Sequence, residues 1–237
     1  MWDTAEESEV PLTGVERAVL AEIATIARFK RGEIIFKEGD PASALFSIID
    51  GVVKLYRMQV GAEEHVVRFM FANDLIGLAE FGKYVNSAKS VTSTTLYKMP
   101  TRALEPRLRQ NPGLEFHILN KLSHELRRTQ DHALLLAKHR ASAKLGMFIR
   151  MLEADQNLAA VDGAELSVPM PRTDIAAYLG MSPEAVTRAF ADLVSCGALS
   201  SRDRRHLKIV DRAKLDAIIA ETEDPTSAST ALPHRRR

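Results

Sequence analysis

Residues 172–210, RTDIAAYLGMSPEAVTRAFADLVSCGALSSRDRRHLKIV, contain two short helical patterns separated by a glycine and followed by a cluster of arginines. Thr173 is a natural N-cap for the first helix, and Gly180 suits the sharp turn that ends it. Ser182 is the expected N-cap of the second helix, with Pro183 at its first position. Two helices joined by a short turn that contains glycine are typical of the helix-turn-helix, whose second helix enters the DNA major groove.

The second helix is predicted to have one apolar and one polar face. A core shared by the two helices would contain Ile175, Ala176, Leu179, Val186, Phe190 and Leu193. The opposite face then carries Glu184, Thr187 and Arg188, at the spacing i, i+3 and i+4. An Arg can bond to guanine O6 and N7, a Glu can accept from a cytosine amino group, and a Thr can contact a thymine methyl. These three side chains are therefore candidates for reading bases, although Glu184 and Arg188 could equally form an ordinary surface ion pair.

Residues 196–210 predict a strand, a basic turn and a second strand, which together would form a wing beside the recognition helix. A charged hairpin tip is usually only solvated, but beside a recognition helix its arginines would lie next to DNA phosphates. The candidates for phosphate contact are Thr173, Ser182, Arg202, Arg204, Arg205 and His206.

The composition is that of a core-forming protein long enough for two domains, with 237 residues, 46% hydrophobic and 27% charged. Its formal net charge of +1 means that any binding to nucleic acid must come from local charge. The single cysteine, Cys196, excludes an intrachain disulfide and fits a reducing cytoplasm. No segment approaches the roughly 20 apolar residues of a membrane span, so we expect a cytoplasmic protein with no membrane partner.

Upstream of the helix-turn-helix the pattern changes twice. Residues 12–29 predict a helix, whereas short apolar runs between turn signals over residues 30–100 predict an antiparallel β-roll. The expected fold is α+β. We expect an acidic arm at 1–11, a β-roll effector-like domain at 12–110, a dimerisation helix at 111–138, a winged helix-turn-helix DNA-binding domain at 139–220 and a disordered tail at 221–237.

The predicted long helix begins with Asn111 as N-cap and Pro112 as its first residue. A stripe with alternating spacings of three and four runs through Leu119, Leu122, Leu126, Thr129, Ala133 and Leu136. About 25 helical residues span about 37 Å, which is longer than one small domain would cover. This length favours a symmetric dimer seam over packing against the chain's own β-domain, and the seam carries no charge, so we predict a constitutive homodimer.

Three stretches together resemble the Crp/Fnr superfamily of transcription regulators. RGEIIFKEGDPASALFSIIDGVVKLYR (31–57) resembles its cyclic-nucleotide-binding β-roll, LEFHILNKLSHELRRTQDHALLLAKHRASAKLGMFI (114–149) its dimerisation helix and hinge, and TDIAAYLGMSPEAVTRAF (173–190) its winged helix-turn-helix. The resemblance covers roughly residues 12–215. It implies a regulator that is not an enzyme, with palindromic double-stranded DNA, a second copy of itself and RNA polymerase as partners.

Within that family, the recognition helix resembles the Fnr and FixK members. Glu184, Thr187 and Arg188 occupy the family's base-reading positions, and Pro183 stands where the cyclic-AMP receptor has an arginine. This likeness implies a palindrome resembling TTGA-N6-TCAA. FixK-type members activate nitrogen-fixation, denitrification and microaerobic genes and are controlled by abundance, which implies an activator that needs no effector.

The chain departs from the family's ligand-binding members. Cyclic-AMP-binding members carry a Glu just after the glycine of the DLIG strand and an Arg-Ser pair farther on, whereas here Leu78 follows Gly77 and residues 79–90 contain no Arg. Oxygen-sensing Fnr proteins use N-terminal cysteines, and residues 1–30 contain none. We therefore expect no cofactor and no metal. Haem binding stays open, with His65, His117, His124, His132 or Met58 as its possible ligands.

Two further roles are open to the β-roll. It could gate DNA binding through an unidentified effector, or it could carry chemistry as a cupin-like enzyme. The enzyme is disfavoured because His65 with Glu63 and Glu64 is the one cluster of metal-ligand types in the predicted strands.

Cys196 lies near the end of the recognition helix. It is either a half-buried filler or a site of redox control, since oxidation would place a charge or an adduct close to DNA.

Overall fold

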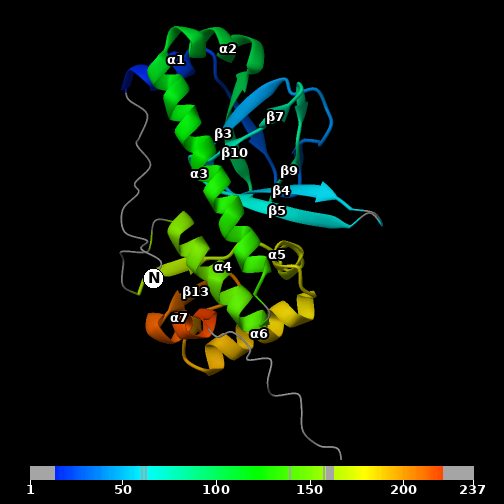
Figure 1. Ribbon diagram of the computed structural model, residues 1–237, viewed down its shortest axis with the longest axis vertical. Coiled ribbons are helices and arrows are strands. Elements are labelled where there is room, and N and C mark those ends of the chain that lie inside the picture. The colour runs from blue at the N-terminus through cyan, green and yellow to red at the C-terminus, as the bar shows by residue number, and fades with distance from the viewer. Residues whose placement is uncertain are drawn as a thin grey trace, which may run out of the picture.

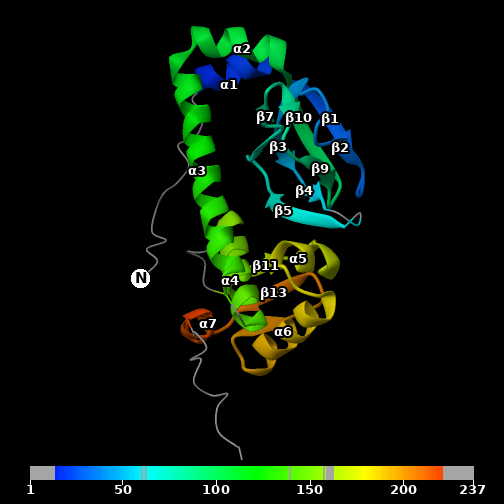
Figure 2. The same ribbon diagram turned by 45° about the vertical axis from the view of Figure 1, so that its right-hand side comes forward.

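The computed structural model describes residues 14–220 apart from 60, 62, 139, 157 and 159–162. A β-domain and a smaller, mainly helical domain lie along one long helix, α3 (Pro112–Leu136), as Figures 1 and 2 show. The predicted β-roll, long helix and helix-turn-helix are all present, so the expected α+β fold is confirmed. The predicted acidic arm at 1–11 and tail at 221–237 lie outside the described residues.

The β-roll consists of two four-stranded antiparallel sheets, with the strand orders β1-β10-β3-β6 and β2-β9-β4-β5, and a small β7-β8 hairpin. Along β3 every second residue is buried, because successive side chains of a strand point to opposite faces. The strands are β1 (Thr25–Phe29), β2 (Ile34–Phe36), β3 (Ala44–Asp50), β4 (Val53–Met58), β5 (Glu64–Met70), β6 (Leu75–Ile76), β7 (Ala79–Glu80), β8 (Lys83–Tyr84), β9 (Ser87–Ser90) and β10 (Thr94–Pro100).

The helix predicted over residues 12–29 is correct only in its first part. Helix α1 spans Gly14–Ala21, and Thr25–Phe29 form strand β1 instead. This strand pairs antiparallel with β10, from Thr25 opposite Lys98 to Phe29 opposite Thr94. Pairing along the edge of the sheet outweighs the local helical spacing, since a strand former is stabilised mainly by its cross-strand neighbours.

Asn111 is the C-cap residue of helix α2 (Thr101–Gln110) and also the N-cap residue of α3, with Pro112 at the first position of α3, as predicted. Its side chain makes no cap of α3, however, and donates from Nδ2 to the carbonyl of Arg107 at 2.7 Å. The residue therefore closes the preceding helix. One face of α3 is buried in the chain through Leu114, His117, His132 and Leu135.

The C-terminal domain packs three helices and a small sheet around α4. Glu153, only 2% exposed, ties α4 to α7 because its carboxylate accepts from Arg212 at 2.6 and 2.9 Å and from Arg150 at 2.7 Å. The sheet has the strand order β11-β13-β12. The elements are α4 (Ala141–Asp155), β11 (Glu165–Ser167), α5 (Arg172–Leu179), α6 (Pro183–Ser195), β12 (Leu199–Ser201), β13 (His206–Ile209) and α7 (Arg212–Ala220). Within the described residues, no helix combines the length and the apolar character that a membrane crossing needs.

Candidate nucleic-acid interface

The turn between α5 and α6 is built as the sequence predicts. Gly180 ends α5 in the left-handed region at φ 62°, where a residue with a Cβ would be strained by about 1–2 kcal/mol. Ser182 caps α6, since its Oγ accepts from the backbone N–H of Ala185 at 3.2 Å, which stabilises the helix by about 1 kcal/mol. Pro183 then occupies the first helical position.

The predicted N-cap of α5, Thr173, is wrong. Pro171 is the N-cap, with extended backbone angles, and its carbonyl accepts from the N–H groups of Asp174 and Ile175 at 3.0 and 3.1 Å. Arg172 is therefore already helical, and Thr173 lies exposed in the first turn.

The two faces of α6 divide as the spacing predicts. All six residues of the expected shared core are at most 9% exposed: Ile175, Ala176, Leu179, Val186, Phe190 and Leu193. Glu184, Thr187 and Arg188 are exposed on the other side.

The polar groups of these three side chains differ in whether they already have a partner within the chain. The hydroxyl of Thr187 donates back to the carbonyl of Pro183 at 2.9 Å. Glu184 and Arg188 make no ion pair with each other or with any other residue that the structure describes. The surface ion pair that the sequence left open is therefore not formed, and both charges face solvent.

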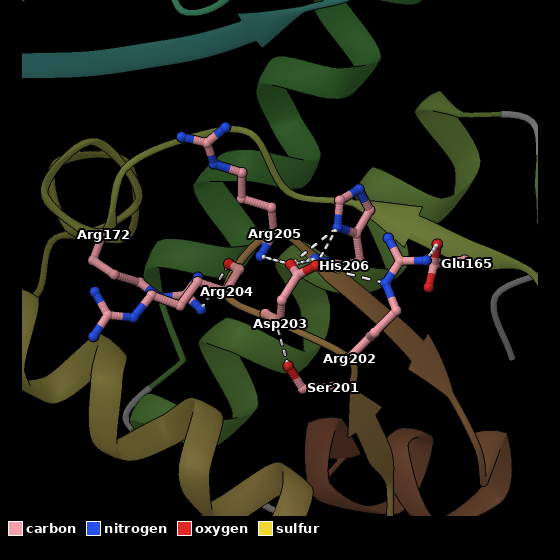
Figure 3. A network of polar contacts seen from close by, with 8 residues as sticks. All are labelled: Glu165, Arg172, Ser201, Arg202, Asp203, Arg204, Arg205 and His206. Atoms are coloured by element: carbon pink, nitrogen blue, oxygen red, sulfur yellow. Dashed lines mark hydrogen bonds and ion pairs between the residues drawn. The ribbon is translucent and has the colours of Figure 1, made fainter.

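The wing is the hairpin of β12 and β13, with the basic turn 202–205 between them (Figure 3). Asp203 holds the turn together. Its Oδ1 accepts from the N–H groups of Arg205 and His206 at 2.7 and 3.0 Å, and Nδ1 of the His206 ring lies 2.9 Å from both carboxylate oxygens. The backbone N–H of Arg205, followed by the His206 ring, lowers the pKa of Asp203 to about 2, so the carboxylate is ionised at neutral pH.

The predicted phosphate-contacting residues of the wing differ in how free they are. Arg202 is paired with Glu165 at 3.0 Å and lies 3.6 Å from Asp203, and His206 is tied to Asp203. Arg204 and Arg205 are exposed, and neither has an acidic partner in the part of the chain that the structure describes. They are therefore available cations of the basic turn.

Sequence reasoning missed Arg172. Its guanidinium lies 3.5 Å from the centre of the Phe190 ring, and its Nη2 donates to the carbonyl of Arg204 at 3.5 Å, so it stands beside the wing (Figure 3). Its Nη1 has no hydrogen-bond partner among the described residues. Burial, and then the charge of Arg204, lower the pKa of Arg172. The signal in the sequence was a basic residue at the first position of the first helix.

The free face of α3 carries an apolar stripe that differs in part from the predicted one. Leu119 and Leu126 are 58% and 62% exposed and Ala133 is exposed, as expected, but Leu122 and Leu136 are half-buried by their own chain. Thr129 is exposed but donates to the carbonyl of Glu125 at 2.9 Å. We define the α3 stripe by its exposed apolar residues: Phe116, Leu119, Leu126, Ala133 and Leu134.

This difference has a geometric cause. The predicted and the exposed stripes share Leu119, Leu126 and Ala133, which follow one another at intervals of seven residues. At 3.6 residues per turn, two such stripes lie side by side on a helix, and only the packing of α3 on its neighbours decides which one is free.

Cys196 is the C-cap of α6 and is exposed, not half-buried as a filler would be. Its Sγ lies 3.3 Å from the carbonyl of Leu193, and its own carbonyl accepts from Lys214 at 3.0 Å. The thiol therefore stands at the end of the recognition helix within reach of solvent.

The buried core of the β-roll contains a stack of three aromatic side chains among aliphatic ones. Phe36 stacks on Tyr84 with ring centres 4.1 Å apart and on Phe46 at 5.7 Å. The Tyr84 hydroxyl accepts from the N–H of Ala44 at 3.2 Å and donates to its carbonyl at 3.0 Å. The polar group of the tyrosine is thus satisfied by backbone.

Comparison with protein families accounts for both domains. The model of the cyclic nucleotide-binding domain matches residues 26–111, and that of the Crp-like helix-turn-helix domain matches residues 143–218. The chain belongs to the Crp/Fnr family. It is accordingly a DNA-binding transcription regulator of the Crp/Fnr type.

Individual Crp/Fnr relatives match nearly the whole chain. The nitrogen fixation regulation protein FixK of Bradyrhizobium diazoefficiens is 28% identical over 223 residues, covering 92% of this chain and 93% of the relative. The transcriptional activator protein anr of Pseudomonas aeruginosa is 28% identical over 191 residues, covering 80% and 78%. The structure of FixK2 from Bradyrhizobium japonicum has the same fold, with a TM-score of 0.77 at 24% identity, covering 85% of this chain and all of that one. Regulators of the Crp/Fnr family act as dimers on DNA.

Proposed function

We propose that this Crp/Fnr regulator reads a palindrome resembling TTGA-N6-TCAA as a homodimer, through Glu184, Thr187 and Arg188. The observation that carries the proposal is that these side chains project together from the first turns of a capped helix whose other face is fully buried. Arg188 bonds to guanine, Glu184 accepts from cytosine, and Thr187, whose hydroxyl is engaged with Pro183, presents its methyl group to thymine.

Phosphate contacts place the helix in the groove. Arg204 and Arg205 on the wing supply positive charge without an internal counter-ion among the described residues, and Arg172 stands beside them. Thr173 and Ser182 lie exposed at the start of α5 and α6, where hydroxyls and backbone N–H groups can bond to phosphate. Arg202 and His206 contribute less because Glu165 and Asp203 already engage them.

The α3 stripe supports the homodimer. It lies on the face of α3 opposite to the buried residues Leu114 and Leu135, and a row of exposed apolar side chains along a helix of this length is stabilised by a second copy. The two half-sites of the proposed palindrome are centred about 10 base pairs apart, which is one turn of DNA, so a twofold-symmetric dimer meets both from one side.

Three features support control without a small-molecule effector. Buried aliphatic and aromatic side chains pack the core of the β-roll, the loop 79–90 lacks an arginine that could hold a phosphate, and the predicted dimer seam has Thr129 where a charged residue would repel its symmetry mate. The functions that the relatives' names give, nitrogen fixation regulation and transcriptional activation, further support an activator of microaerobic or nitrogen-fixation genes that contacts RNA polymerase.

Selection of binding sites from random DNA with the purified, nucleotide-free and metal-free protein tests the proposal. We expect enrichment of a twofold-symmetric TTGA-N6-TCAA-like site. Enrichment that appears only after cyclic nucleotide or haem is added would favour a ligand-gated regulator, and no preference for symmetric over scrambled DNA in any condition would refute the proposal.

A further inference from the structure

Lys54 of β4 connects the β-roll to the helix-turn-helix. The side chain is nearly fully buried, at 6% exposure, and its Nζ lies 2.5 Å from Glu64 of β5 and 2.8 Å from Asp174 of α5. Glu64 is also bound by Lys89 at 3.3 Å. The ammonium group of Lys54 is thus shared between a carboxylate of its own sheet and a carboxylate of the DNA-binding domain. These two carboxylates, Glu64 and Asp174, are 110 residues apart in the chain.

The surrounding contact between the two domains is apolar. Strand β5 lies over α5 in both views (Figures 1 and 2), and the rings of Phe69 and Tyr178 are 5.5 Å apart. Val66 and Phe69 belong to the same buried cluster as the core of α5 and α6. Apolar contacts have no preferred direction, so they set the angle of α5 on β5 less specifically than an ion pair does.

An ion pair of defined geometry removes that freedom. Burial alone would lower the pKa of Lys54, but the hydrogen bonds and charges of Asp174 and Glu64 outweigh it and raise the pKa, so the ammonium stays charged. A buried charge must remain next to its partners, because separating them leaves a desolvated charge unpaired. The Lys54–Asp174 pair therefore favours the position of α5 over the sheet in which the two charges meet.

We propose that Lys54 is a positioning residue for DNA recognition, which acts through Asp174 to set the angle of the helix-turn-helix on the β-roll. The inference rests on the proposed function. Helices α5 and α6 pack directly on each other through buried side chains, so a shift of α5 on the sheet would carry α6 with it. The α3 stripe joins the two copies, so the angle of each unit on its own β-roll decides the separation of the two recognition helices.

The consequence is selectivity for the spacer between the half-sites. Two linked binding units gain about 100- to 10,000-fold in affinity, but only where the geometry lets both bind at once. With the ion pair in place, the dimer accepts a six-base spacer and rejects five or seven. Without the ion pair, each helix-turn-helix unit still binds its half-site, but the two units of the dimer adapt to all three spacers.

The test compares the affinity of the full-length protein for palindromes with five-, six- and seven-base spacers and for a single half-site. Asp174→Asn is the main variant, since it keeps the shape of the side chain and leaves Lys54 paired with Glu64. Lys54→Met is the second. Arg57→Met is the matched control. Arg57 lies on the same strand as Lys54, but its side chain is 59% exposed, and the variant breaks only its ion pair with Glu38.

We expect the wild type and Arg57→Met to bind the six-base spacer at least about tenfold more tightly than the other two spacers. For Asp174→Asn and Lys54→Met we expect a preference of about twofold or less. A ratio between spacers cancels any uniform change of affinity that the lost charge causes. Unchanged spacer preference in Asp174→Asn, at wild-type affinity for the half-site, would overturn the inference. Failure of the wild type to prefer any palindrome would instead overturn the proposed function.

Discussion

The imidazole of His132 lies parallel to the phenol ring of Tyr178, with ring centres 4.0 Å apart and an angle of 4° between the planes. Its Nε2 lies 2.8 Å from the backbone carbonyl of Tyr178, which can only accept, so Nε2 carries a proton and donates it. The pair joins α3 to α5. Burial, together with the charges of His65 and Arg68, lowers the pKa of His132, and burial raises the pKa of Tyr178 to about 12.

The buried His132 predicts a stability that depends on pH. The unfolded chain binds a proton at His132 near its ordinary pKa of 6.5, whereas the folded chain binds it only at lower pH. The free energy of unfolding should therefore fall as the pH drops below about 6.5. Urea unfolding at pH 7.5 and 5.5 measures this loss. His132→Gln keeps a donor for the Tyr178 carbonyl but does not titrate, so its loss should be smaller; equal losses in both proteins would contradict the role of His132.

Arg188→Ala and Arg204→Ala should weaken DNA binding in different ways. Loss of Arg188 should cost about 1–3 kcal/mol and relax discrimination at one base pair, because a bidentate contact to guanine disappears. Loss of Arg204 should weaken binding to all sequences alike and reduce the salt dependence, because a phosphate contact disappears. Titrations against the palindrome and its single-base variants at several salt concentrations separate the two. The assignment fails if Arg188→Ala lowers every affinity by the same factor.

A charge in the α3 stripe should separate the dimer. Leu126 is 62% exposed, and Leu126→Glu would place two carboxylates opposite each other in an apolar seam. We expect monomers at micromolar concentration by sedimentation equilibrium, against dimers for the effector-free wild type. Gln110→Glu adds the same charge at an exposed polar position of α2 and should remain dimeric. A wild type that dissociates at this concentration would contradict a constitutive dimer.

Glu153→Ala should destabilise the C-terminal domain by about 3 kcal/mol, since it leaves the guanidinium groups of Arg150 and Arg212 without their shared buried partner. Glu105→Ala is the comparison. Its ion pair with Arg109 is exposed on α2 and is worth only about 0.3–0.5 kcal/mol. Chemical denaturation of the three proteins measures the difference, and similar losses in both variants would show that burial of the carboxylate does not matter.

Oxidation of Cys196 should weaken DNA binding if the exposed thiol at the end of α6 is a redox control. A sulfinic or glutathionylated side chain would place negative charge or bulk near the recognition helix. Peroxide-treated wild type should then lose affinity while treated Cys196→Ser does not. Equal sensitivity of the two proteins would end this proposal.

The local elements of the helix-turn-helix were open to prediction because short-range chemistry determines them. Gly180 relieves left-handed strain, Ser182 satisfies a free N–H group at the start of α6, and the spacing of three and four residues separates a buried face from an exposed one. The same kind of pattern also suggested that Thr173 would be an N-cap and that residues 25–29 would be helical. Both predictions failed where a neighbouring residue or strand offered the backbone better partners.

The sequence alone thus determined the type and order of most elements, the buried core of α5 and α6 and the outward placement of Glu184, Thr187 and Arg188, since these depend on residues within a few positions of one another. Only the tertiary structure decided which stripe of α3 stays free, that Arg172 lies beside the wing, and that Lys54 meets Asp174 across 120 positions. Such contacts depend on how distant surfaces pack, and no local periodicity encodes that.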